Sequence, residues 1–324
     1  MNTRIKLGTA AVALALATSA HAAYPEKTIS IVVPFAAGGP TDIVARTVAE
    51  AMAKSIPGSK IIVENSAGAG GTIGAAKVSR ASPDGYTALI HHIGMSTAPA
   101  LYRKMQFDPL KDFEYVGLII DVPMTLIAKK SLPVNNLKQL VFYAKANPGK
   151  LNLANAGVGS ASHLCGLLFQ SAIETDLITV PYGGTAPAMT DLRGGNVDIM
   201  CDQITSTSNV IKSGDVKAFA VTTPKRIESL KDLPTMAEEG LPGASLSVWH
   251  GMYLPKGTPK PVIDTLQAAL KEALRDPAVV KRFAELGTTP VAANRVTPEA
   301  LQKHLTAEVA KWGPIIKKAN IYAD

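Results

Sequence analysis

The sequence is poor in the residues on which metal and nucleic-acid sites depend. Its 324 residues include only two cysteines, and aromatic residues make up 5% of the chain. No His or carboxylate spacing near the cysteines suggests zinc, and the dispersed charges form no basic tract with interleaved aromatics. We therefore expect no metal, no cofactor and no nucleic-acid partner.

Long hydrophobic runs are also missing beyond the N-terminal segment, so nothing after it predicts a membrane span. The chain begins with basic residues, an apolar run from Leu7 to Ala17, and small residues at Ala20 and Ala22. This order is typical of a secretory signal peptide, residues 1–22, cut after Ala22. No cysteine lies near the cut, which argues against a lipid anchor. We expect a soluble, exported protein.

Positive charge is only slightly in excess over negative charge. Lys and Arg number 33 against 26 Asp and Glu, and removal of the two basic residues of the signal peptide leaves 31 against 26, or +5. A mild positive field suits an acidic ligand, but it equally serves solubility. The remaining residues, about 300, alternate between strand and helix patterns and predict an α/β protein with two lobes.

What the chain has in abundance is glycine at turns that follow short apolar strands. Four such turns occur, at Phe35–Thr41, Ser66–Thr72, Ala156–Ser162 and Tyr182–Pro187. A strand, a glycine turn and a helix start together present backbone N–H groups and a positive dipole end to an anion. None of the four turns contains Lys or Arg. An anion there would be held by backbone N–H groups, hydroxyls and water.

Two apolar stretches bracket the middle of the chain, Tyr115–Ala128 and Val216–Thr223. Between them lies a full set of strand and helix patterns with two of the glycine turns. We expect one lobe, residues 123–226, to be inserted into another, residues 23–122 and 227–324, with the two stretches forming a two-stranded hinge. Closure about that hinge would bring turns from both lobes onto one ligand in the cleft between them.

Enzyme motifs are incomplete. The segment Gly68–Gly74 has Ile73 where the dinucleotide pattern needs glycine, and no Gly-Lys pair is followed by Ser or Thr. Ser160 and His163 could act as nucleophile and base, but the G-x-S-x-G elbow and an identifiable acid partner are missing. We assign no catalytic residue. An exported hydrolase using these two residues is one alternative.

The two cysteines, Cys165 and Cys201, belong to an exported chain, where disulfides can form. Cys165 falls on the helix after the third glycine turn, and Cys201 follows the strand Val197–Met200. They can therefore be neighbours in one lobe. The sequence leaves two outcomes open, a disulfide or two small buried thiols.

A set of motifs together resembles the Bordetella uptake gene (Bug) family, the periplasmic solute-binding proteins of tripartite tricarboxylate transporters. The resemblance covers essentially the whole mature chain, in order and with similar spacing. The motifs are Pro34–Asp42, Glu64–Gly74, Pro83–Tyr86, Gly157–Leu164, Tyr182–Ala188, Trp249–Gly251 and Pro255–Pro259.

This resemblance implies a type II periplasmic-binding-protein fold, in which two α/β lobes close on a small mono-, di- or tricarboxylate, aliphatic or aromatic. It also implies a periplasmic monomer that delivers the ligand to the permease subunits of a tripartite tricarboxylate transporter. A protein that senses the ligand and docks a two-component sensor kinase is the second alternative.

In that family one ligand carboxylate is typically held by backbone groups, hydroxyls and bridging waters, without an Arg clamp. Carried onto this chain, the resemblance implies ligand contacts at Phe35, Ala37, Gly39, Thr41, Gly68, Ala69, Gly70, Ser160, Tyr182, Thr185 and Asp202.

For the far end of the ligand the sequence offers three further candidates. We select His91 and Ser96, from a loop after the strand Tyr86–Ile90, and Trp249, which could stack on a flat ligand or simply pack. His91 and His92 are adjacent, and neighbours on a strand point to opposite faces, so we expect no simple metal pair. With His250, they depart from the family pattern.

Overall fold

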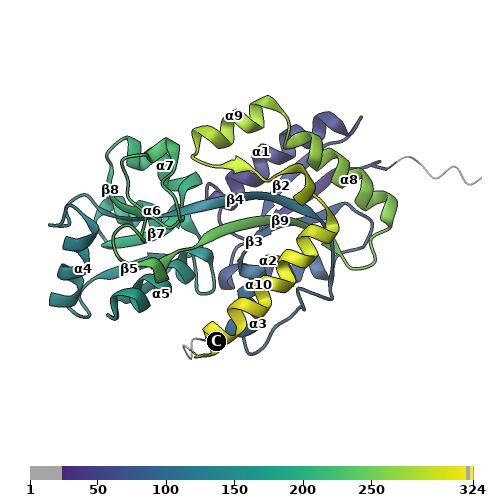
Figure 1. The fold of residues 1–324 in the computed structure, drawn as a ribbon. Coiled ribbons are helices and arrows are strands. Elements are labelled where there is room, and N and C mark those ends of the chain that lie inside the picture. Colours follow the sequence, from purple (N-terminus) through teal and green to yellow (C-terminus); the bar gives the residue numbers. More distant parts are fainter. Residues whose placement is uncertain (1–23, 319–321, 324) are drawn as a thin grey trace, which may run out of the picture.

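The structure is a computed structural model that describes residues 24–318, 322 and 323 (Figure 1). The expected signal peptide, residues 1–22, lies outside the described residues. Within the described part, no helix is both long enough and apolar enough to cross a membrane.

Strands and helices alternate along most of the chain. The strands are β1 (Ile29–Val33), β2 (Ile61–Asn65), β3 (Thr87–His92), β4 (Phe113–Lys129), β5 (Asn152–Asn155), β6 (Ile178–Pro181), β7 (Ile199–Gln203), β8 (Val216–Val221), β9 (Ser247–Pro255) and β10 (Thr289–Pro290). The helices are α1 (Pro40–Ser55), α2 (Thr72–Ser79), α3 (Gly94–Leu101), α4 (Leu137–Ala146), α5 (Ala161–Ile173), α6 (Thr185–Gly194), α7 (Ile204–Lys212), α8 (Lys260–Ala273), α9 (Pro277–Glu285) and α10 (Pro298–Lys318). Short 3-10 helices are η1 (Ala69–Gly71), η2 (Glu228–Leu230), η3 (Pro242–Ala244) and η4 (Ala293–Arg295).

One mixed sheet connects the two lobes through β4. The strand order is β2-β1-β3-β9-β4-β7-β5-β6, with β8 and β10 also paired to β4. The first part of β4, up to Pro123, pairs with β9, whereas Met124–Lys129 pairs with β7 and β8. In Figure 1, β4 therefore crosses the whole molecule with β9 beside it. The α/β architecture predicted from the sequence is confirmed.

The chain returns to the first lobe later than the sequence pattern suggests. Every paired residue of β8 faces the second-lobe part of β4, at Thr125–Lys129. After β8, η3 still packs against α5, and only at Ser247 does β9 begin, opposite Pro123. The second passage between the lobes is thus near Ser247, because β8 ends inside the second lobe.

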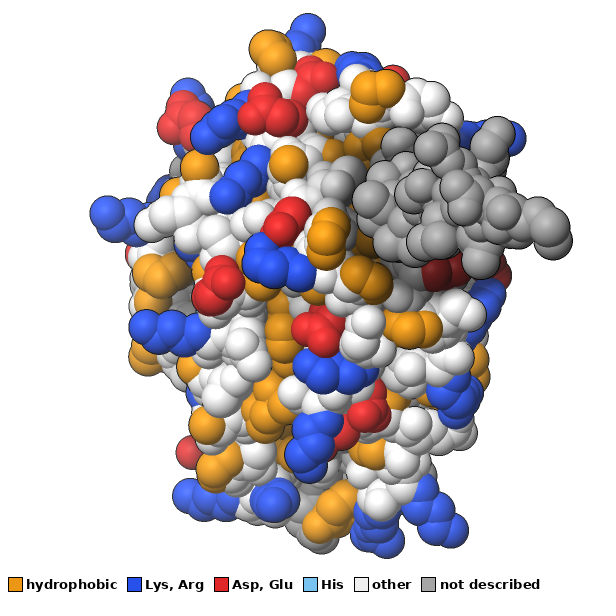
Figure 2. All heavy atoms as spheres, turned by 90° about the vertical axis from the view of Figure 1, so that its right-hand side faces the viewer, with side chains coloured by type: hydrophobic (Ala, Val, Ile, Leu, Met, Phe, Trp, Pro, Cys, Tyr) orange, Lys and Arg blue, Asp and Glu red, His pale blue; other side chains and the backbone are white. Residues whose placement is uncertain are grey.

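Helices cover both faces of the sheet and bury its apolar residues. In α1, Pro40 occupies the first turn, and Val44, Val48 and Met52 lie on one fully buried face. On another side α10 packs along α3 and β4 (Figure 1). Figure 2 shows basic and acidic side chains interspersed over the face at the right-hand end of Figure 1, in keeping with the modest net charge.

In the second lobe a disulfide joins Cys165 of α5 to Cys201 of β7, with Cα atoms 5.9 Å apart. Of the two outcomes that the sequence left open, the structure has the bridge. It links the helix that follows the third glycine turn to the strand that ends at Asp202 and Gln203.

Candidate ligand-binding site

The four glycine turns meet between the lobes. A Cβ on Gly70, in the second turn, would lie 2.1 Å from the carbonyl oxygen of Val158 in the third. A Cβ on Gly184, in the fourth turn, would lie 2.7 Å from Cβ of Ala36 in the first. Such close approaches require glycine, and Gly70 also has a φ of 60°.

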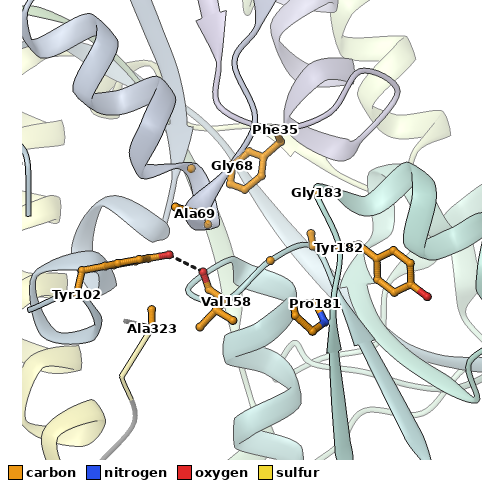
Figure 3. A pocket seen from close by; sticks show the side chains of 13 residues that line it. Phe35, Gly68, Ala69, Tyr102, Val158, Pro181, Tyr182, Gly183 and Ala323 are labelled. Carbon is orange, nitrogen blue, oxygen red and sulfur yellow. Dashed lines mark hydrogen bonds between the residues drawn. The ribbon is translucent and has the colours of Figure 1, made fainter. Parts of the chain in front are cut away.

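A hydrogen bond closes the same junction. The Tyr102 hydroxyl, at the end of α3 in the first lobe, donates to the carbonyl oxygen of Val158 at 2.8 Å (Figure 3). The lobes therefore touch through both backbone and side chain, and the cleft is in a closed arrangement.

The cleft contains two adjoining chambers that share Phe35 and Ala156. The outer chamber has a volume of about 240 Å³, and its lining residues are Phe35, Gly68–Gly71, Tyr102, Ala156–Val158, Pro181–Gly183 and Ala323 (Figure 3). The inner chamber has a volume of about 10 Å³, and its lining residues are Phe35, Pro40, Thr41, His92, Ala156, Ser160–Ser162, Thr185, Asp202 and Gln203. The inner chamber admits one water-sized group. A larger ligand would place one end there and its body in the outer chamber.

Helix N-termini converge on the inner chamber. Thr41 lies in the first turn of α1, Ser160 caps α5, Thr185 begins α6, and Gln203 immediately precedes α7. The free N–H groups and positive dipole ends of such helices favour an anion. None of the lining residues of either chamber is Lys or Arg. The site therefore suits a carboxylate without presenting a cationic side chain.

The hydroxyls around the inner chamber are not equally free to donate. Thr185 donates to the Asp202 carboxylate at 2.7 Å, and Ser162 donates to the carbonyl oxygen of Cys201 at 2.6 Å. Ser160 instead accepts a hydrogen bond from the backbone N–H of His163 at 3.2 Å. Its own proton therefore remains available to a ligand.

Asp202 is a buried acceptor at the wall of this chamber. Burial raises the pKa of its carboxyl to about 6, against the opposing effect of hydrogen bonds from Thr185 and the Gln203 backbone N–H. Gln203 Oε1 is buried, with no hydrogen-bond partner in the described part of the chain. This wall can accept hydrogen bonds from a hydroxyl or amino group of a ligand.

Histidines support the aromatic ring that both chambers share. Phe35 stacks on His92, with ring centroids 4.7 Å apart, and meets the edge of His91 at 5.5 Å. The two imidazoles lie 4.9 Å apart, contrary to the expected opposite faces, because they end β3, where His91 Nδ1 accepts the backbone N–H of His92. Burial lowers the pKa of His92 to about 3, so this ring is neutral near pH 7.

Of the two adjacent histidines, the one that lines a chamber is His92 and not His91, which we had expected at the far end of the ligand. His92 lines the inner chamber, whereas His91 packs behind Gly71, whose Cβ would lie 2.7 Å from Nε2 of His91. Ser96 is buried in α3 and donates to the carbonyl oxygen of Ile93. We expected Ser96 on a loop and in contact with the ligand, but it lies within α3 and its hydroxyl turns back to the main chain.

Trp249 lies away from both chambers. It is 2% exposed, and its ring meets the edge of His304 of α10, with centroids 4.8 Å apart. Its neighbour on β9, His250, contacts Thr41 at the inner chamber. Because successive side chains on a strand point to opposite faces, Trp249 is directed to the packed side.

The remaining expected contacts differ in what they offer. Phe35, Thr41, Gly68, Ala69, Gly70, Ser160, Tyr182, Thr185 and Asp202 line one or both chambers, whereas Ala37 and Gly39 belong to the first turn without lining either. Tyr182 contributes its main chain, because its ring points away from the cleft and its hydroxyl donates to Asp191 at 2.6 Å (Figure 3).

Several lining residues had no assignment from the sequence. Gln203 follows Asp202 at the start of a helix, and this helix-start pattern could have identified it. Tyr102 and Val158 meet only in three dimensions, since they are 56 residues apart, and no local pattern marks their contact.

In the described part of the chain, Ser160 and His163 do not make the side-chain contact of a nucleophile and its base. The imidazole Nδ1 of His163 accepts the backbone N–H of Gly159, and the contact between Ser160 and His163 is through the backbone. Burial lowers the pKa of His163 to about 4. Among the described residues, no cluster of His, Cys, Asp or Glu could hold a metal ion.

Comparisons with known proteins agree with this geometry. Residues 44–321 match the family described as tripartite tricarboxylate transporter family receptor. An Agrobacterium vitis protein, described as a UPF0065 protein in the TAR-I ttuE-ttuC' intergenic region, is 48% identical over 300 residues, covering 93% of this chain and 86% of its own.

Solved structures are also similar. The periplasmic binding protein BugD is 52% identical, with a TM-score of 0.90 over 92% of this chain and 99% of its own. MatC from Rhodopseudomonas palustris with bound malate is 38% identical, with a TM-score of 0.87 over 90% and 100%. R. palustris Rpa4515 with adipate is 34% identical, with a TM-score of 0.87 over 93% and 99%.

Proposed function

We propose that this chain, which belongs to the tripartite tricarboxylate transporter family of receptors, captures a small carboxylate between its lobes in the periplasm and delivers it to the permease of such a transporter. The observation that carries this proposal is the convergence of several helix N-termini and the hydroxyls of Thr41 and Ser160 on one closed chamber. These groups hold an anion and supply no reactive side chain. Binding without turnover is the expected activity.

The two chambers hold different parts of the ligand. One carboxylate oxygen enters the inner chamber and meets the hydroxyls of Thr41 and Ser160 and the helix N-termini. The rest of the molecule lies in the outer chamber against Phe35, Tyr102 and Val158. The volume of about 240 Å³ is below the roughly 300–1,000 Å³ of drug-sized sites. Malate and adipate in the two similar structures support a short aliphatic dicarboxylate as the first class to test.

Capture requires that the lobes open and close. We place the two crossings in β4 near Pro123 and in the chain near Ser247, which revises the second lobe to residues 123–246. Small-angle scattering with and without saturating ligand tests this motion, because closure predicts a smaller radius of gyration in the bound state. An unchanged radius would contradict it.

A thermal-shift screen of the mature protein tests the function itself. The panel comprises aliphatic mono-, di- and tricarboxylates, acidic amino acids and aromatic acids. A binder at about 100 times its dissociation constant adds about 2.7 kcal/mol to the free energy of unfolding. A shift with one class identifies the ligand class. Silence across the panel, with no retained ligand found by mass spectrometry after unfolding, would contradict the proposal, as would repeated conversion of any acid.

A further inference from the structure

His250 is a buried side chain that contacts a ligand-binding hydroxyl without itself lining a chamber. It lies on β9, paired with His92 of β3, and is 0% exposed. Its Nε2 is 3.3 Å from the hydroxyl oxygen of Thr41, which lines the inner chamber. Its Nδ1 is buried and has no hydrogen-bond partner among residues 24–318, 322 and 323.

The tautomer of this imidazole decides what Thr41 offers a ligand. If the proton is on Nδ1, an N–H donor is buried unpaired and Nε2 must take the Thr41 proton, so the hydroxyl turns its lone pairs to the chamber. If the proton is on Nε2, that N–H donates to the Thr41 oxygen and the hydroxyl proton is free. A buried, unpaired N–H is rarer in proteins than an under-used acceptor.

We infer that His250 carries its proton on Nε2 and acts as a positioning residue, fixing the Thr41 hydroxyl as a donor toward a bound carboxylate. This inference rests on the proposed function for the identity of the bound group. The opposite arrangement would place the lone pairs of the Thr41 oxygen against an anion. The tautomer therefore decides whether the contact between Thr41 and the carboxylate is attractive or repulsive.

The surroundings of His250 keep it neutral. Its aromatic neighbour is His92, whose ring centroid is 5.8 Å away, and Thr41 is the one polar side chain that an observed hydrogen bond brings to it within the described chain. Burial lowers the pKa of His250 well below its ordinary value, with His92 adding to the effect. A neutral ring has a single N–H, so only one nitrogen can donate.

Long-range proton–nitrogen NMR spectra of the free mature protein read the tautomer directly, because protonated and unprotonated ring nitrogens have separate ¹⁵N shifts. His250→Gln identifies the signals by their loss. We expect a neutral ring protonated on Nε2. A ring protonated on Nδ1, or on both nitrogens near pH 7, would overturn the inference, and this result does not depend on which ligand the protein binds.

Binding of malate, measured by calorimetry, supplies the second readout. We expect His250→Leu to weaken binding about tenfold, the loss of one well-placed donor to a charged group. His250→Gln, whose side-chain amide can still donate near Thr41, should recover most of this loss. In a Thr41→Val background, His250→Leu should cost nothing further.

His304→Leu is the matched control, because His304 is a histidine packed on Trp249, away from the chambers. It should leave malate affinity unchanged. If His250→Leu binds like the wild type while Thr41→Val loses affinity, the positioning role is wrong. If the wild type does not bind malate, the choice of ligand in the proposed function fails, and the NMR result alone decides the tautomer.

Discussion

The inner and outer chambers of the cleft are built from different materials. The inner chamber is lined by polar groups that are fixed by hydrogen bonds to one another. The Thr185 hydroxyl and the Gln203 backbone N–H, for example, both donate to the Asp202 carboxylate. The outer one is walled largely by glycine backbone and by the apolar groups of Phe35 and Val158. Fixed polar groups select a chemical class, whereas backbone and apolar walls select size and shape. The inner chamber should therefore fix the carboxylate, and the outer chamber the identity of the acid.

The largest expected effect tests whether the wall of the inner chamber is held covalently. The bridge between Cys165 and Cys201 closes a loop of 36 residues' separation beside Ser162 and Asp202. Loop-closure entropy for this separation predicts a loss of about 4 kcal/mol from the free energy of unfolding in the Cys165→Ala/Cys201→Ala variant. Urea unfolding measures it. Reduced wild type is the control and should match the variant; a loss below about 1 kcal/mol would contradict the prediction.

Gly70→Ala tests the contact between the lobes at the outer chamber. Its Cβ would meet the Val158 carbonyl oxygen at 2.1 Å, so closure over the ligand should be blocked while each lobe still folds. We expect ligand affinity to fall at least about 100-fold, or about 2.7 kcal/mol, by calorimetry.

Gly313→Ala is the control for that variant, since a Cβ there has no neighbour within 4 Å. It should bind like the wild type. Full affinity in Gly70→Ala would show that the closed contact is dispensable.

The next largest effect is a loss of stability in acid, caused by buried histidines at and near the inner chamber. Burial lowers the pKa of His92 to about 3 and that of His163 to about 4, below the ordinary 6.5. Their contribution to stability is therefore present above pH 6.5 and lost as the pH falls through 6.5 toward those values, by up to about 1.4 kcal/mol per unit for each ring. At about pH 5.5 the two rings together lower the free energy of unfolding by about 3 kcal/mol relative to about pH 7.5.

Asp202 opposes this trend, because burial raises its pKa to about 6 from 3.8. Its stabilising contribution is present below about pH 4 and lost as the pH rises through 6. Acidification to about pH 5.5 therefore raises the free energy of unfolding by about 1 kcal/mol through this group. These three groups together lower the free energy of unfolding by about 2 kcal/mol from about pH 7.5 to 5.5. The buried His91 and His250, whose pKa values are also lowered, act in the same direction, so the total loss should be at least this large. Urea unfolding at both pH values checks this loss, and His163→Gln should reduce it by about 1.4 kcal/mol, the contribution of one ring. Equal stability at the two pH values would be inconsistent with neutral buried histidines.

Ser160→Ala gives the smallest of these effects. It removes a helix cap and a hydroxyl that remains free to donate, so we expect about a tenfold loss of affinity and about 1 kcal/mol of stability. Asn136→Ala removes a cap from α4 in the same way but away from the cleft. The control should lose stability alone. If both variants keep full affinity, the Ser160 hydroxyl does not contact the ligand.

The sequence predicted the elements of the fold because their signals are local. The strand, glycine turn and proline of Ile29–Pro40 determine β1 and the start of α1 through backbone preferences. The return to the first lobe that we propose near Ser247 differs from the one expected at Val216–Thr223, because that stretch has the composition of a buried strand in either lobe. Only its pairing with Thr125–Lys129 assigns it to the second.

Residues that line the candidate cleft were predictable where the main chain forms its wall. Glycines such as Gly68 and Gly70 line the cleft because of backbone geometry, which sequence spacing conveys. The directions of His91, Ser96 and Trp249 depend instead on tertiary packing. The sequence offered all three as candidate ligand contacts and left packing open for Trp249, and the structure packs each of them outside the chambers.

The most direct test of the account is a crystal structure of the mature protein with the acid that gives the largest thermal shift. We predict one ligand carboxylate within hydrogen-bond distance of the Thr41 and Ser160 hydroxyls, with the rest of the molecule in the outer chamber beside Phe35. A carboxylate held only in the outer chamber, or outside the cleft, would contradict the assignment of the inner chamber as the carboxylate site.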